Sequence, residues 1–216
     1  MVDELLVYAA AFLVILLIVL LALRLLRRTF NPIELFLIIL CPILSVIEIS
    51  TSIELFAIQN TVFGIDIAGA AIPLLVSASL FIRSIGKIRF IDFIGATIVV
   101  ALSAYSVTEL TAAGIISPFP IYLVPPLIAT IVALMASPRL FAGRLAYFSS
   151  VLGVLIGADL IRLREIADSG IVEKVVIGGA RVGDMIFISG IIAVVMSSIL
   201  VPFGKRERED VEVEER

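Results

Sequence analysis

The chain is built from long apolar runs that are separated by short clusters of charged residues. The first run, Leu5 to Leu26, spans 22 residues and ends in the basic cluster Arg24, Arg27 and Arg28. A helix needs about 20 apolar residues to cross the hydrocarbon of a bilayer. Hydrophobic residues make up 61% of the chain. A soluble domain of this size could not keep so many apolar side chains out of water. The pattern predicts an all-α integral membrane protein.

Seven segments are predicted to form a bundle of transmembrane helices. They are Leu5–Leu26, Ile33–Ile49, Ala68–Ile85, Ile91–Thr108, Tyr122–Ala136, Leu145–Ile161 and Met185–Phe203. We expect one polytopic domain over residues 1–204 and a charged cytoplasmic tail over residues 205–216, where ten of twelve residues are charged. Residues 48–56 and 61–67 alternate polar and apolar side chains around a turn, which predicts a short extracytoplasmic β-hairpin. An irregular loop is the alternative.

The orientation follows from the distribution of basic residues. With seven spans, twelve Lys and Arg residues fall on one side of the membrane and four on the other, namely Arg162, Arg164, Lys174 and Arg181. Loops rich in Lys and Arg stay in the cytoplasm. The sequence therefore predicts a protein of the cell membrane with its N-terminus outside and its C-terminus in the cytoplasm.

Several kinds of chemistry are excluded by the residue types present. The chain has no histidine and one cysteine, Cys41, so catalysis by Ser-His or Cys-His pairs and ordinary zinc sites are excluded. No metal, cofactor or nucleic acid is expected. Acidic residues are the catalytic residue type that remains in number.

Two aspartates end neighbouring apolar segments. Asp159 closes the sixth predicted span and Asp184 opens the seventh, and only a short connection separates them. Neither carboxylate can face lipid cheaply, so each should point into a pocket lined by protein or water. Two carboxylates that share a site can hold one proton between them and activate a water molecule. Asp159 and Asp184 are therefore the candidate catalytic residues.

Other residues near the two aspartates are candidates for substrate binding. Gly178 and Gly179 permit a tight turn whose N–H groups could bind an anion, and Arg181 and Asp66 lie on the same predicted side. Structural roles are the alternatives. Asp159 could pair with Arg162 or Arg164, Asp184 could cap the seventh helix, and Asp66 is placed as a natural N-cap.

Four stretches of the sequence resemble a known family. They are FGIDIAGAAIPLLVS, PPLIATIVAL, LAYFSSVLGVLIGADLIRL and IGGARVGDMIFISGIIAVV, and in this order they are similar to prokaryotic membrane proteins of the domain of unknown function 1614 family, over roughly residues 45–200. The resemblance implies a multi-pass membrane protein and carries no activity. The chain departs from the family pattern at Ile67-Ala68-Gly69, where the resemblance implies an Asn-Val-Gly-Gly type sequence.

Three functions remain open from the sequence, so whether the protein is an enzyme is undecided. The first is hydrolysis of a peptide or lipid-linked substrate at the outer leaflet by the two aspartates. The second is transport of an ion or small solute, and the third is a non-catalytic scaffold or sensor. The expected partners are the lipid bilayer and an unidentified peptide, lipid or small-solute ligand, with a homo-oligomer left open.

Overall fold

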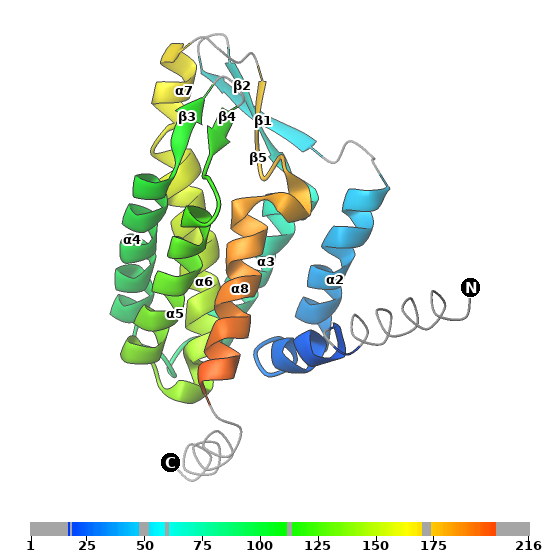
Figure 1. The fold of residues 1–216 in the computed structure, drawn as a ribbon, viewed down its shortest axis with the longest axis vertical. Coiled ribbons are helices and arrows are strands. Elements are labelled where there is room, and N and C mark those ends of the chain that lie inside the picture. The colour runs from blue at the N-terminus through cyan, green and yellow to red at the C-terminus, as the bar shows by residue number, and fades with distance from the viewer. Residues whose placement is uncertain are drawn as a thin grey trace, which may run out of the picture.

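Helices form a bundle, and all the described strands gather at one end of it (Figure 1). The computed structural model describes residues 17, 19–47, 52–58, 61–111, 114–169 and 174–201. Most of the first predicted span and the charged tail lie outside these residues. We call the two ends of the bundle the strand end and the opposite end.

After residue 31, the described part of the bundle has six principal helical segments, several of which begin or end in a turn of another helix type. In chain order they are α2 (Pro32–Val46), η1 (Ile67–Ala71) leading into α3 (Ile72–Ser84), α4 (Phe90–Val107), η2 (Ile121–Leu123) leading into α5 (Val124–Ala136), η3 (Arg139–Phe141) leading into α6 (Ala142–Val154) and the π-helix η4 (Leu155–Leu160), and η5 (Arg181–Gly183) followed by α8 (Met185–Leu200). A short helix, α7 (Leu163–Ser169), follows η4.

Within the described residues, three helical stretches are long and apolar enough to cross a membrane: Ile67–Ser84, Phe90–Val107 and Arg139–Asp168. Three shorter apolar helices accompany them, Pro32–Val46, Ile121–Ala136 and Met185–Leu200. The protein is therefore mostly helical in its described part and has the character of a membrane protein. Each predicted span from the second to the seventh coincides with one of these helical stretches.

Helix starts are fixed by short-range hydrogen bonds. Asn31 caps α2 and forms a capping box with Glu34, whose carboxylate accepts the N–H of Asn31 at 2.7 Å. Asp66 caps η1 by accepting the N–H groups of Ala68 and Gly69. These bonds satisfy N–H groups that a helix start would otherwise leave unpaired. The prediction that Asp66 is an N-cap is confirmed.

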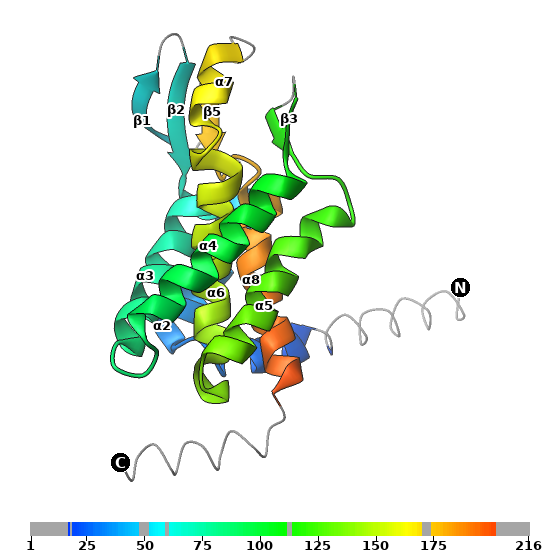
Figure 2. The ribbon, with the colours of Figure 1, turned by 90° about the vertical axis from the view of Figure 1, so that its left-hand side faces the viewer.

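Helix α6 lies at the centre of the bundle and packs against α3, α4, α5 and α8 (Figure 2). Its close approach to α4 depends on two glycines. A side chain at Gly153 would collide with Val100, and one at Gly157 would collide with the backbone of Ala101. Small residues let two membrane helices approach closely in this way.

The strand end contains more secondary structure than expected. The predicted hairpin is confirmed as β1 (Ser52–Ile58) paired antiparallel with β2 (Thr61–Asp66). Strand β5 (Lys174–Ile177) adds to β2 in parallel, and β3 (Glu109–Thr111) pairs with β4 (Gly114–Ile116). The sequence predicted a Gly- and Pro-rich loop over residues 114–120 and a short connection over residues 162–183, since runs of three or four residues are too short to show a strand period.

The strands and α7 share a small core of their own. Phe63 is fully buried and clusters with Ile166 and Ala167 of α7, against which Val175 of β5 and Ile115 of β4 pack. This cluster joins the two sheets through α7. It holds β4 and the segment after β5 over the ends of α6 and α8, where the candidate site lies.

Candidate functional site

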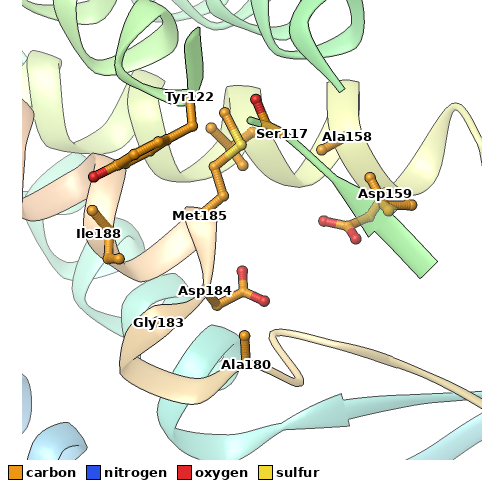
Figure 3. A pocket seen from close by; sticks show the side chains of 11 residues that line it. Ser117, Tyr122, Ala158, Asp159, Ala180, Gly183, Asp184, Met185 and Ile188 are labelled. Carbon is orange, nitrogen blue, oxygen red and sulfur yellow. The ribbon is translucent and has the colours of Figure 1, made fainter. Parts of the chain in front are cut away.

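A cavity of about 240 Å³ opens at the strand end. Four parts of the chain form it: the end of α6 with η4, the segment from η5 into α8, strand β4, and the loop from β4 to η2. Its lining residues are Ile115, Ser117, Tyr122, Val154, Ala158, Asp159, Ala180, Gly183, Asp184, Met185 and Ile188 (Figure 3). Both predicted catalytic residues are among them.

Asp159 lies in the π-helix at the end of α6. In the described part of the chain its carboxylate makes no hydrogen bond and no ion pair. The two arginines that could have neutralised it have other partners. Arg162 donates to Glu165 and to the carbonyls of Tyr105 and Thr108, and Arg164 faces Asp168 at 3.8 Å. The alternative that Asp159 pairs with either arginine is therefore wrong.

Asp184 is the N-cap of α8, and its carboxylate accepts the N–H of Ile186 at 3.0 Å. The predicted capping role is confirmed. Burial raises the pKa of this carboxyl to about 6, against the lowering effect of backbone hydrogen bonds from Ile186 and Ala180, and the charge of Asp66 adds to the rise. A carboxyl with such a pKa changes its protonation state near neutral pH.

The two carboxylates face each other across the cavity. Figure 3 shows Asp159 and Asp184 reaching into the same space from opposite sides, and they lie within electrostatic range of each other. No hydrogen bond joins them in the described structure. The space between them is therefore open to a third group.

Two hydroxyl groups in the wall were not expected from the sequence. Ser117 and Tyr122 reach the cavity from the loop after β4 and from η2, and the Ser117 hydroxyl donates to the carbonyl of Val107 at 2.7 Å. The Gly- and Pro-rich composition of residues 114–120 predicted a loop but gave no sign that it would cover the aspartates. Met185 and Ile188 supply an apolar side to the same cavity.

The comparisons with known proteins assign the chain to a family. The sequence model of the family described as "Protein of unknown function (DUF1614)" matches residues 18–196. This chain belongs to that family. The comparison with curated proteins and the comparison with solved structures gave no match.

The remaining predicted site residues of this DUF1614 protein lie outside the cavity lining. Arg181 donates from its guanidinium to the carbonyl of Ser45. The N–H of Gly179 donates to Val176 and that of Arg181 to Gly178, so neither is free to bind an anion. Gly178 also packs directly on Gly69 of η1, where a side chain at Gly69 would overlap its carbonyl oxygen. These contacts position η5, and with it Asp184.

The acidic residues of the described segments do not form a cluster suited to a metal ion, since no group of three or more His, Cys, Asp or Glu side chains occurs there. In this DUF1614 protein the cavity offers two carboxylates from different elements and an apolar wall, with Ser117 and Tyr122 among its lining residues. Such a set can move protons and bind a neutral or cationic group.

Proposed function

We propose that this DUF1614 membrane protein is a hydrolase whose Asp159 and Asp184 act as an acid–base pair on a peptide or lipid-linked substrate at the outer leaflet. One observation carries the proposal: two carboxylates from different elements share one cavity, and neither is neutralised by a basic side chain of the described residues. Both side chains are half-buried, and an acid that is partly removed from water is costly to keep without a partner. Paired acids that avoid neutralisation are typical of catalytic sites.

The surroundings of the two residues support different roles. Asp184 accepts a backbone hydrogen bond, which favours its ionised form, and its pKa of about 6 suits a general base near neutral pH. Asp159 accepts none, so it is the better carrier of a proton. In the proposed reaction Asp184 takes a proton from a water molecule whose oxygen attacks the substrate carbonyl, and Asp159 gives its proton to the leaving group.

The shape of the cavity supports a substrate that is partly apolar. Tyr122, Met185 and Ile188 form a wall beside the aspartates, and α8 continues from that wall into the apolar bundle. A peptide segment near the membrane surface or the head of a lipid-linked molecule would present a scissile bond next to an apolar group. Both classes fit this wall.

Transport is the second candidate, and buried hydroxyls in the bundle favour it. Ser77 on α3, Tyr147 and Ser150 on α6 and Ser189 on α8 are buried, and none of their hydroxyls has a hydrogen-bond partner among the described residues. Buried polar groups usually have a partner, so these hydroxyls could serve a solute that enters from the aspartate cavity. Hydrolysis remains the better supported function because Asp159 and Asp184 both lie at the strand end, whereas a transport route would also need such groups along the length of the bundle.

The experiment compares Asp159→Asn and Asp184→Asn with Asp168→Asn, a matched control at an exposed aspartate of α7. The purified proteins are reconstituted in liposomes and given a fluorogenic peptide library, lipid-linked substrates and a panel of labelled solutes. We expect each cavity variant to lower cleavage by about 100-fold or more, as is usual for loss of an acid or base, while Asp168→Asn keeps full activity. Solute uptake that either cavity variant stops, without any cleavage, would replace hydrolysis by transport.

A further inference from the structure

A second hollow, which we call the aromatic groove, lies between α3, α4 and α6. These helices belong to the three stretches that are long and apolar enough to cross a membrane. The groove has a volume of about 330 Å³ and its surface is apolar throughout. It is lined by Phe81, Phe90, Phe93, Ile94, Thr97, Ile98, Phe148, Leu152 and Ile156. None of these residues belongs to the aspartate cavity.

Three interlocked rings form the inner wall of the groove. Phe93 meets Phe81 and Phe148 edge-on, with ring centroids 4.9 Å and 4.8 Å away, and Phe81 stacks on Phe148 at 5.4 Å. Phe93 is buried, whereas Ile94 and Ile98 at the rim are exposed. Edge-on and offset ring pairs stabilise one another. The groove is therefore preformed and opens toward the outer face of the bundle.

The groove runs along α4, one of the helices that are long and apolar enough to cross a membrane. Its lining on α4 extends from Phe90 to Ile98, which corresponds to about 12 Å of helix at 1.5 Å per residue. Half the hydrocarbon thickness of a bilayer is about 15 Å. This length suits an acyl chain from one leaflet.

Positive charge gathers where the groove begins, at the opposite end of the bundle. Arg89 directly precedes Phe90 and its exposed guanidinium is held by Asp92 at 2.8 Å. Lys87 and Arg144 both lie over the ring of Phe141, with their charged groups 5.2 Å and 5.0 Å from its centroid. Basic residues at the membrane surface attract anionic headgroups.

We propose that the aromatic groove binds one acyl chain of an anionic phospholipid, with the lipid phosphate placed at Lys87 and Arg89. The apolar surface accounts for the chain and the basic residues for the charge of the headgroup. A zwitterionic lipid would bring its own cationic group to the same basic residues, so the site favours a lipid with net negative charge. The binding is independent of the aspartate cavity.

The experiment uses the absence of tryptophan from the chain. Phe90→Trp places a single fluorophore in the groove lining, and Ile91→Trp places one on the next residue outside it. Phe90 and Ile91 are 65% and 64% exposed and lie at the same depth, so the pair is matched. Each protein is reconstituted in nanodiscs that contain increasing fractions of phosphatidylglycerol or phosphatidylcholine with dibrominated acyl chains, which quench tryptophan on contact.

The measured quantity is the fraction of brominated lipid that quenches half of the tryptophan fluorescence. For Phe90→Trp we expect this fraction to be at least about threefold lower with phosphatidylglycerol than with phosphatidylcholine, because the basic residues select the anionic lipid. Ile91→Trp should show no such preference. Adding Lys87→Gln and Arg89→Gln to Phe90→Trp should remove it. Equal quenching of Phe90→Trp by both lipids, or the same preference at both positions, would overturn the proposal.

Native mass spectrometry gives a second test that needs no fluorophore. The unmodified protein, extracted from membranes that contain both lipids, should retain one phosphatidylglycerol molecule. The Lys87→Gln/Arg89→Gln protein should lose it. Retention of the same lipid by both proteins would also contradict the site.

Discussion

Asp184 combines two roles at one residue, because the carboxylate that caps α8 also lines the aspartate cavity. A cap requires an oxygen that accepts an N–H group, and asparagine supplies one as well as aspartate does. Replacement by asparagine therefore removes the charge while it keeps the cap. The charge of Asp184 can be examined on its own in this way.

The first prediction concerns the dependence of stability on pH. The pKa of Asp184 in the folded protein is about 6, above its ordinary value of 3.8, so the folded state binds the proton more tightly than the unfolded chain does. The charged carboxylate lowers the free energy of unfolding above about pH 6, and this loss disappears as the pH falls toward 4. As the pH falls from about 6 to 4, the melting temperature of the protein should therefore rise relative to that of Asp184→Asn.

The measurement is thermal unfolding of both proteins in detergent between pH 4 and pH 8. All other titrating groups are shared, so the difference between the two melting temperatures isolates residue 184. We expect Asp184→Asn to be the more stable protein at pH 8 and the two to converge near pH 4. A difference that does not change with pH would contradict the raised pKa.

A second prediction at this scale concerns Arg162, which is buried and stacks on the ring of Tyr105 at 4.5 Å. Its guanidinium donates to carbonyls at the end of α4, and Arg162→Gln leaves those acceptors without their charged donor. Loss of hydrogen bonds from a charged donor costs about 2 kcal/mol. Arg164→Gln is the control, because Arg164 is exposed and its distant pair with Asp168 contributes less than about 1 kcal/mol. Chemical unfolding that affects both variants equally would contradict the role given to Arg162.

Among the elements, the contact between α4 and α6 depends most on a single residue type. Gly157 lies against the backbone of Ala101, whereas Gly95 on the same helix as Ala101 has open space where a side chain would be. Both glycines lie in helical segments of the described chain. They therefore differ in packing far more than in backbone conformation.

The third prediction follows from this difference. Gly157→Ala should destabilise the protein by about 2 kcal/mol or more, because the added methyl group collides with backbone that cannot rotate away. Gly95→Ala should be neutral or stabilising by up to about 1 kcal/mol, since alanine favours a helix. Melting temperatures of the two variants in the same detergent provide the measurement. Similar losses at both sites would show that the close approach of α4 and α6 does not matter for stability.

The elements also show what a sequence of this kind can reveal. The helices were predictable because, in lipid, the backbone N–H and C=O groups of an apolar run of 15 or more residues are satisfied almost only by forming a helix. The β1–β2 hairpin followed from its alternation. Strand β5 was not predictable. Its four residues pair with β2, which lies more than a hundred positions earlier in the chain, and a local sequence pattern does not indicate so distant a pairing partner.

The candidate site was predictable in part for the same reason. Asp159 and Asp184 stood out because carboxylates are rare beside apolar runs, and both line the cavity. Ser117 and Tyr122 did not stand out, because hydroxyl groups in a loop are common. The contacts of Arg162 with the end of α4 also depend on the tertiary structure, and only the structure shows that Asp159 lacks a basic partner.

For the whole molecule, the orientation in the membrane is the fourth prediction. The excess of Lys and Arg on one side of the predicted spans predicts that the strand end lies outside the cell. Cys41 is the single cysteine and is fully buried, so a Cys41→Ala background is suitable for labelling new cysteines. Glu54→Cys on β1 should react with a membrane-impermeant maleimide in intact cells, and Arg89→Cys at the opposite end should react only after lysis. The reverse pattern would invert the orientation and place the aspartate cavity in the cytoplasm.

The parallel pairing of β2 with β5 has a consequence for how the protein is made. Residues 61–66 leave the ribosome long before residues 174–177, and four principal helical segments and the short helix α7 are synthesised in between. A nascent chain therefore carries β2 with one edge uncovered until β5 has been translated. Since Asp184 follows β5, a nascent chain that ends before β5 holds only Asp159, and the two acids can meet only after β5 has been made.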